Sequence, residues 1–142
     1  MQVSGADLNT LVDGITLVDR LMAPTRIYVK PLLRLIAELP VHGLSHITGG
    51  GLIENIPRVV PDGLEVVLER KAWRREAVFD WLQRQGQVSD AEMYRVFNCG
   101  IGMTVQLRPS DAERAIGILN GMGQEALVIG EVRSGTRGVV IA

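Results

Sequence analysis

The chain has 142 residues, of which 46% are hydrophobic and 22% charged, and its formal net charge is −1. This length and composition predict one folded domain with a hydrophobic core and exclude a disordered chain. The near-neutral charge, without a long basic run, argues against nucleic acid as the main partner, and no apolar stretch is long enough to span a membrane.

The N-terminus and the cysteine content both bear on the cellular compartment. The first residues lack the basic start and the apolar stretch of a signal peptide. Cys99 is the only cysteine, which excludes an internal disulfide and a zinc site built from several cysteines. We therefore expect a cytoplasmic protein with no metal site of its own.

The first half of the chain is predicted to alternate helix and strand. Apolar residues recur at helical spacing over residues 26–39. Because proline is tolerated only in the first turn, Pro31 requires this helix either to begin near residues 28–30 or to kink there. Residues 41–48 are predicted to form a buried strand. Residues 52–56 are expected to form one or two helical turns, and residues 64–68 a second strand after a Pro-Asp-Gly turn.

The second half predicts three helices and three strands. Residues 73–84 have an amphipathic pattern in which Trp73 and Trp81 are packing residues, and the Arg74-Arg75 pair is expected on a solvated face. Two Ser-Asp-Ala-Glu sequences, which begin at Ser89 and Ser110, are capping boxes that predict short helices. The predicted strands are residues 102–107, 127–132 and 138–141, the last two joined by a turn at Ser134-Gly135.

These elements together predict an α/β (α+β) fold. The strand, helix and strand within residues 102–132 would form a crossover unit. The whole chain would then contain a mixed sheet of four to five strands packed with helices.

One glycine-rich stretch concentrates the chemistry: His46-Ile47-Thr48-Gly49-Gly50-Gly51-Leu52-Ile53-Glu54-Asn55-Ile56-Pro57-Arg58. Consecutive glycines leave main-chain N–H groups unshielded and can adopt positive φ. Thr48, Asn55 and Arg58 add side-chain donors, and donors that converge on a glycine turn suit a phosphate group. A glycine cluster by itself would equally suit a tight connection between strand and helix.

Two histidines lie four residues apart on the predicted strand and therefore face the same side. His46, beside the glycines, is a candidate for proton transfer or ligand contact. His42 is expected to be a hydrogen-bonded histidine at the end of the sheet. We expect no metal between them, because no third ligand is nearby.

A second turn contains Asn98-Cys99-Gly100-Ile101-Gly102. A nucleophilic role is open to Cys99, but a lone cysteine beside a strand is more typical of a small buried hydrophobic residue. Gly100 and Gly102 are expected to allow the close approach of another chain segment or of a ligand.

Three motifs resemble, in the same order, sequences of the phosphoribosylformylglycinamidine cyclo-ligase (aminoimidazole ribonucleotide synthetase) family. The resemblance extends from about Val3 to Ile141. The motifs are Ala23-Pro24-Thr25-Arg26-Ile27-Tyr28-Val29-Lys30, the stretch from His46 to Arg58, and Glu92-Met93-Tyr94-Arg95-Val96-Phe97-Asn98-Cys99-Gly100-Ile101-Gly102-Met103.

The resemblance implies that residues 1–142 are the C-terminal α/β domain of a two-domain enzyme, slightly truncated at its start. The N-terminal ATP-binding domain of the family would precede residue 1 and is absent from this chain. The complete enzyme would use ATP and Mg²⁺, bound mainly by that domain, to close the imidazole ring of formylglycinamidine ribonucleotide in purine biosynthesis. It would be a homodimer formed largely through the N-terminal domain, and the isolated chain would be inactive.

The resemblance also implies which residues face the substrate. The expected contacts to substrate or phosphate are Thr48, Gly49, Gly50, Gly51, Asn55 and Arg58. His46 is the expected proton-transfer or orienting group. Arg26 and Asn98 lie in matching motifs, where a structural role is equally expected.

Two other interpretations remain open. The chain could be a stand-alone phosphate- or nucleotide-binding module that has kept the fold without the reaction. It could also belong to another branch of the superfamily, such as selenophosphate synthetase, thiamine-monophosphate kinase or a hydrogenase maturation factor. The combined motifs favour the purine enzyme.

Overall fold

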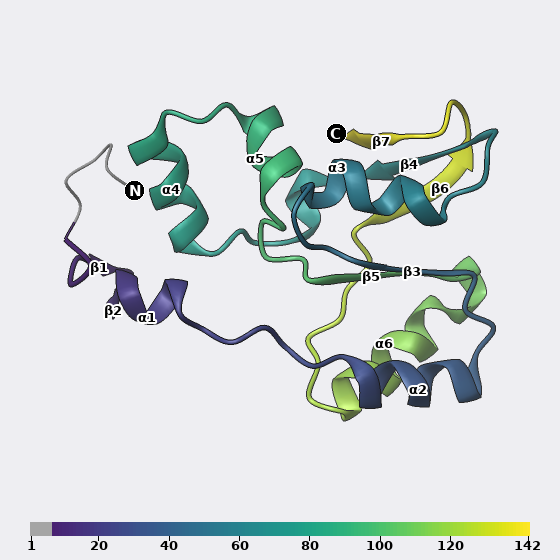
Figure 1. Cartoon of the computed structure of the whole chain (residues 1–142). Helices are drawn as coiled ribbons and strands as arrows, with labels where there is room; N and C mark the ends of the chain where they lie inside the picture. The colour runs from purple at the N-terminus through teal and green to yellow at the C-terminus, as the bar shows by residue number, and fades with distance from the viewer. Residues whose placement is uncertain (1–6) are drawn as a thin grey trace.

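The computed structural model describes residues 7–142. Figure 1 shows an elongated molecule with the N-terminal elements at one end and the two larger sheets at the other. Met1 to Ala6 lie outside the described residues, and with them Val3, where the family resemblance begins. The strands are β1 (Leu11–Val12), β2 (Ile15–Thr16), β3 (Gly43–His46), β4 (Leu64–Leu68), β5 (Met103–Gln106), β6 (Gly130–Ser134) and β7 (Val139–Ile141). The helices are α1 (Leu17–Leu21), α2 (Val29–Glu38), α3 (Gly51–Asn55), α4 (Ala77–Gly86), α5 (Asp90–Val96) and α6 (Ala112–Gly121), with 3₁₀ turns η1 (Ile56–Val59), η2 (Arg70–Ala72) and η3 (Pro109–Asp111).

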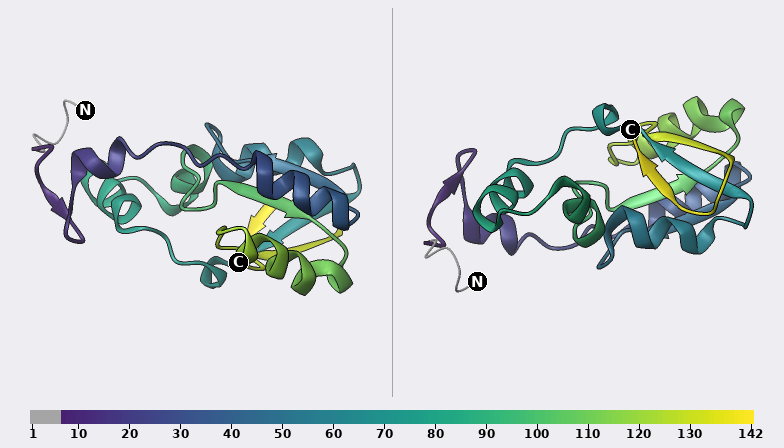
Figure 2. Two further views of the ribbon diagram at one scale, coloured as in Figure 1. Left: turned by 90° about the horizontal axis from the view of Figure 1, so that it is seen from below. Right: turned by 90° about the horizontal axis from the view of Figure 1, so that it is seen from above.

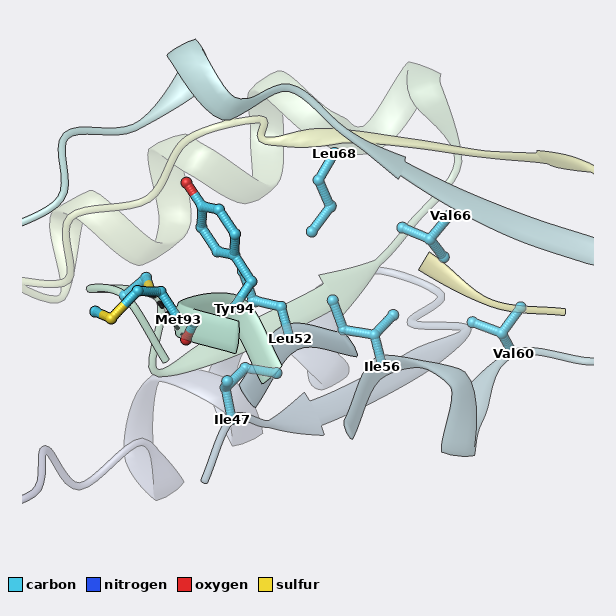
Figure 3. Packing of buried hydrophobic residues seen from close by; sticks show 9 residues of the cluster. Ile47, Leu52, Ile56, Val60, Val66, Leu68, Met93 and Tyr94 are labelled. Atoms are coloured by element: carbon cyan, nitrogen blue, oxygen red, sulfur yellow. Dashed lines mark hydrogen bonds between the residues drawn. The ribbon is translucent and has the colours of Figure 1, made fainter. Parts of the chain in front are cut away.

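The predicted mixed α/β class is confirmed, but the prediction of a single mixed sheet of four to five strands is wrong. β3 and β5 form an antiparallel pair, and β4 lies in a separate three-stranded sheet between β6 and β7. The main core separates the two sheets, because α3 and η1 insert apolar side chains between them. Figure 3 shows Leu52 and Ile56 facing Val66 and Leu68 of β4.

The predicted crossover unit is also wrong, because β5 and β6 belong to different sheets. α6, which follows β5, packs against α2 through Leu35, Leu39 and Ala115 rather than returning the chain to the β3–β5 sheet. Beyond α6 the chain passes to the other sheet, where β6 pairs antiparallel with β4.

The last two predicted strands exist, but they do not pair with each other. β4 lies between them, antiparallel to β6 and parallel to β7. Pairing of β6 begins at Gly130 rather than Leu127, and at Gly130 the carbonyl oxygen of Val67 occupies the space that a Cβ would need. The absence of a side chain at Gly130 therefore permits β6 to approach β4 closely.

The helix predictions are correct in part. α2 begins at Val29 with Pro31 in its first turn, as expected, and the Ser89 hydroxyl accepts from the Glu92 N–H at 3.3 Å. The Ser110 capping box does not form, because residues 109–111 make a 3₁₀ turn and Asp111 becomes the N-cap.

α4 begins at Ala77, later than predicted, because Trp73 turns into the core and its Nε1 donates to the Cys99 carbonyl at 3.1 Å. Trp81 instead packs against a separate cluster formed by Val12, Leu17 and Val78. The expectation of a solvated arginine pair holds for Arg74 and is wrong for Arg75, whose side chain is 15% exposed and donates to Asp80 and Gln83.

An extended segment, residues 22–28, connects the N-terminal cluster with α2. Figure 2 shows from two further directions that this segment runs along the molecule without joining either sheet. It is exposed except for Tyr28, whose ring is partly buried. Tyr28 thereby brings the first of the three motifs to the end of β3.

Candidate functional site

The glycine turn, residues 48–51, connects the end of β3 to the start of α3. Gly50 and Gly51 adopt φ values of 97° and 55°, in the left-handed region that favours glycine. The Gly51 N–H donates to the Thr48 carbonyl at 3.0 Å, and the Glu54 N–H donates to the Gly50 carbonyl at 3.0 Å. The path of the backbone therefore favours glycine at positions 50 and 51.

The three glycines have different surroundings. A Cβ on Gly51 would meet the carbonyl oxygen of Tyr94, so this glycine lets α3 pack against α5. A Cβ on Gly50 would lie 2.8 Å from Oε2 of Glu54. A Cβ on Gly49 would have no neighbouring atom within 4 Å, and Gly49 does not adopt a left-handed φ. Its missing side chain therefore leaves open space instead of relieving a contact.

Asn55 is buried and holds the turn from inside. Its side-chain Nδ2 donates to the carbonyl oxygens of Gly51 at 2.8 Å, Gly49 at 3.2 Å and Thr48 at 3.5 Å. The Ser45 hydroxyl in turn donates to the Asn55 carbonyl at 2.9 Å. The observed role of Asn55 is to fix the shape of the turn, and its contact with a ligand stays a prediction.

Three main-chain N–H groups of the turn have no backbone partner among the described residues. Within residues 7–142, the N–H groups of Thr48, Gly49 and Gly50 donate to no backbone acceptor, and both Thr48 and Gly49 are exposed. Glu54 places a carboxylate near Gly50. Arg95 lies 3.4 Å from that carboxylate but pairs more closely with Glu92, at 2.6 Å, so it offsets the Glu54 charge only in part. Successive free N–H groups in such a turn are suited to an anion.

Arg58 lies at the far end of the same helical segment. It is exposed, near the end of η1, and no ion pair of its side chain is found among the described residues. At about 1.5 Å per residue, its Cα lies roughly 10 Å along the helical axis from Gly51. The structure therefore brings Thr48, Gly49, Gly50 and Asn55 together but does not bring the Arg58 backbone to the turn.

His46 ends β3 on the exposed side of the sheet, close to the glycine turn. Its ring lies against Tyr28 in a T-shaped arrangement, with 5.8 Å between ring centroids and 69° between ring planes. The hydroxyl of Tyr28 occupies the space that a Cβ on Gly102 would fill. Residues from all three motifs therefore meet beside the turn. The spacing of residues along the sequence could not have revealed the contacts of Tyr28, because they join segments that are distant in the sequence.

The other histidine and Arg26 lie apart from this meeting point. His42 is at the opposite end of β3, where its main-chain N–H donates to the Gln106 carbonyl at 2.9 Å. The expected hydrogen bond at the sheet end is thus made by the backbone of His42. Arg26 is exposed in the segment that precedes Tyr28.

Cys99 is buried, as the hydrophobic interpretation predicts. Its Sγ contacts the Met93 carbonyl at 3.5 Å, and burial raises the pKa of the thiol to about 11. The protonated thiol is a poor nucleophile. Asn98 has a structural role, because its Oδ1 accepts from the Gly100 N–H at 3.0 Å.

Two surface hollows lie away from the turn. One, of about 460 Å³, has Ile53, Tyr94 and Ile141 among its lining residues and Arg70 beside Asp90 at 3.1 Å. The other, of about 410 Å³, lies between the sheets and includes His42. Neither of these two hollows includes residues 46–51.

The described residues contain neither a grouping of metal-binding side chains nor a membrane-spanning helix. Within residues 7–142, no three His, Cys, Asp or Glu side chains are grouped so that they could hold a metal ion. None of the helices in this range has both the length and the apolar character needed to cross a bilayer.

The fold is similar to that of a solved structure, E. coli HypE, a hydrogenase maturation protein. The similarity has a TM-score of 0.63 and covers 92% of this chain and 38% of HypE, at 20% sequence identity. At this identity the comparison supports the fold alone.

Sequence comparison gives much closer relatives. The chain is 54% identical over 138 residues to a phosphoribosylformylglycinamidine cyclo-ligase of Cupriavidus pinatubonensis, and 53% identical over 132 residues to one of Paraburkholderia xenovorans. These matches cover 97% and 93% of this chain but only 39% and 37% of the relatives, so the chain spans about two fifths of their length.

A family model describes the same region. The model of the AIR synthase related protein, C-terminal domain, matches residues 1–142. This match covers the whole chain and agrees with the mixed fold and with the relatives found by sequence. The chain therefore belongs to the family of AIR synthase related proteins, as a C-terminal domain.

Proposed function

We propose that this chain is the C-terminal part of a phosphoribosylformylglycinamidine cyclo-ligase. The observation that supports this best is the 54% identity over 97% of the chain to an enzyme of that name. The complete protein would form 5-aminoimidazole ribonucleotide, ADP and phosphate from formylglycinamidine ribonucleotide and ATP. It would act in the cytoplasm as a homodimer, and the N-terminal ATP-binding domain would be the partner of this chain.

The chemistry of ring closure requires an activated oxygen. In the proposed reaction the γ-phosphate of ATP is transferred to the formyl-derived amide oxygen, which releases ADP. A nitrogen of the same molecule then attacks the activated carbon, and the C–O bond to the phosphorylated oxygen breaks as phosphate leaves. Because nucleophile and electrophile belong to one substrate, holding them in the reacting geometry lowers the barrier substantially.

The glycine turn would bind a phosphate of the substrate or the transferred phosphoryl group. The N–H groups of Thr48, Gly49 and Gly50, which have no backbone acceptor among the described residues, and the open space at Gly49 support this role. Asn55 would keep the donors in place through its bonds to the carbonyl oxygens of the turn. His46 would orient the substrate or transfer a proton, and Arg58 would contact a more distant part of the ligand.

Magnesium does not fit the described part of this chain, because residues 7–142 contain no group of acidic, histidine or cysteine side chains able to hold it. We assign Mg²⁺ and most ATP contacts to the N-terminal domain. The isolated chain is accordingly expected to be inactive.

The test is to restore activity by adding the missing part. The N-terminal segment of the Cupriavidus pinatubonensis relative would be produced separately and mixed with this chain, and ADP formation dependent on formylglycinamidine ribonucleotide would be measured. We expect activity only with both parts present. Turnover by this chain alone would contradict the assignment of ATP chemistry to the N-terminal domain.

The role of the turn is tested in the same mixture with Gly49→Val. Valine fits the backbone there but fills the open space, so ADP formation should fall by roughly 10–100-fold. Gly117→Val is the matched control, because Gly117 is exposed and also has no atom within 4 Å of an added Cβ. Equal activity of the Gly49 variant and the control would exclude the turn as the phosphate site.

A stand-alone phosphate-binding module is the second candidate, and the open turn is compatible with it. Calorimetry of the chain alone with ribose 5-phosphate separates the two. Binding that Gly49→Val abolishes, together with failure of the mixture to form ADP, would favour the binding module over the ligase.

A further inference from the structure

We propose that Tyr28 is a positioning residue that fixes the orientation of the His46 ring beside the glycine turn. The contact between the two rings is a property of this chain. The kinetic consequence rests on the proposed function, in which His46 faces the substrate.

The first observation concerns the freedom of His46. Its side chain is exposed, and within residues 7–142 the ring makes no side-chain hydrogen bond or ion pair. An exposed imidazole without a partner samples several rotamers. The T-shaped contact with Tyr28, at 5.8 Å between centroids, is the interaction that restricts it.

The second observation concerns how Tyr28 itself is held. It is partly buried and immediately precedes α2, and its carbonyl oxygen accepts from the Leu32 N–H at 3.0 Å. At the other end of the side chain, the hydroxyl occupies the position that a Cβ on Gly102 would take. The backbone of Tyr28 is therefore held by the start of α2, and its hydroxyl lies against the backbone of Gly102.

The third observation is the position of Gly102 in the sheet. Its carbonyl oxygen accepts from the Ile47 N–H at 2.9 Å, directly after His46. Gly102 does not adopt a left-handed φ, so its backbone would tolerate alanine. The role we assign to Gly102 is therefore steric, because it leaves room for the Tyr28 side chain.

The contact can be tested in the chain as it stands by NMR. Cross-peaks between the ring protons of Tyr28 and His46 are expected, and the ring current of Tyr28 should displace the His46 ring signals from their random-coil positions. Tyr28→Phe should keep the displacement and Tyr28→Leu should abolish it. Ile27→Ala, which changes the adjacent exposed side chain, is the control and should leave the His46 signals unchanged.

A second pair of variants tests the steric role of Gly102. Gly102→Ala should push the Tyr28 ring aside and shift the His46 signals, although both aromatic residues are retained. Adding Tyr28→Phe should partly restore them, because removing the hydroxyl leaves Cζ of the ring, at 3.1 Å, as the nearest atom to the new Cβ. Unchanged His46 signals in both Tyr28→Leu and Gly102→Ala would overturn the proposal.

The kinetic consequence is measured in the reconstituted mixture. Tyr28→Leu should lower kcat by about tenfold while KM changes little, since a misplaced group mainly affects the reacting geometry. Tyr28→Phe should restore the rate, and Tyr28→Leu should cost nothing further when combined with His46→Ala. If His46→Ala alone is silent, the proposed role of His46 fails, whereas the NMR result decides the positioning by Tyr28 independently.

Discussion

The main-chain carbonyl oxygen of Tyr94 occupies the space into which a side chain on Gly51 would project. The Phe97 carbonyl oxygen is also close, 2.7 Å from the same point. Both acceptors belong to the backbone, so they cannot rotate away as a flexible side chain would. The last glycine of the turn is therefore required for packing between α3 and α5, whatever ligand the turn binds.

This relationship predicts that Gly51→Ala destabilises the fold. Overlap with backbone and strain at a positive φ together should cost about 3 kcal/mol. Urea unfolding measures the change, and Gly49→Ala is the matched control, with an expected effect within about 1 kcal/mol because its surroundings are open. Equal destabilisation by the two variants would contradict the different surroundings of the glycines.

Asn55→Ala should loosen the turn. The variant removes the buried hydrogen bond to the Gly51 carbonyl and the part-buried one to the Gly49 carbonyl, which should cost about 2 kcal/mol. Hydrogen exchange at residues 48–51 should become faster. Asn120→Ala provides the comparison, because Asn120 accepts one exposed hydrogen bond from Ala126 at 3.0 Å and should lose less stability. A larger loss at Asn120 would refute the structural role of Asn55.

Features that depend on interactions between residues close in the sequence could be predicted, and features that depend on distant residues could not. Local rules predicted the start of α2 near residues 28–30 from Pro31, and the cap at Ser89, because proline geometry and side-chain capping act within one turn. The same kind of rule failed at Ser110, where the preceding Pro109 made a 3₁₀ turn and moved the cap to Asp111. Two local preferences competed there, and the pattern did not decide between them.

Pairing between strands could not be predicted in the same way. The positions of the strands followed from composition, but the pairing partner of each strand depends on which core side chains lie between the sheets. Ile56 and Val60 are core residues, and their segments gave no indication of this in the sequence. The site shows the same limit. The glycine turn was evident in the sequence, whereas the contacts of Gly51 with Tyr94 and of Tyr28 with Gly102 join distant segments.

The buried thiol of Cys99 should react slowly. Its pKa is raised from 9.0 to about 11 by burial, so the thiolate fraction near pH 8 should be about 100-fold lower than in the unfolded chain. Labelling with a thiol reagent, with and without urea, measures the ratio. Equal rates in the two states would contradict the burial of the side chain.

The same thiol should make stability depend on alkaline pH. Because the folded pKa is raised, the unfolded chain loses its proton first, and the contribution to stability is lost as pH rises from 9.0 toward about 11. Other groups also titrate in this range, so the measurement is the difference between the native sequence and Cys99→Ala. A flat difference between the two would refute the linkage.

Asp90 should make stability depend on acidic pH in the opposite direction. A hydrogen bond from Gln83 and the charges of Arg70 and Arg75 hold the pKa of this carboxyl below its ordinary value. Its contribution is therefore present above the unfolded pKa and is lost as pH falls below about 4. Asp90→Asn should weaken this loss in urea unfolding at several pH values, and an unchanged slope would show that the contact contributes nothing.

The outer face of α2 predicts self-association of the isolated chain. Val29, Leu33 and Ile36 are spaced to form one stripe and are 60%, 62% and 48% exposed. Leu33→Glu should lower the concentration dependence of the mass measured by light scattering and change stability by less than about 0.5 kcal/mol. A mass that is independent of concentration in the native chain would rule out association through this face.

The position of β4 between β6 and β7 determines when the last sheet can form. β6 and β7 do not pair with each other. Among the described strands, each pairs only with β4, which joins Leu64 to Ser134 and Val66 to Val139, residues that lie far apart in the sequence. Closing the long loop between such residues costs entropy before any contact compensates for it. During synthesis, β4 would therefore emerge long before either partner, with both edges unpaired, and this sheet could be completed only after β7 had left the ribosome.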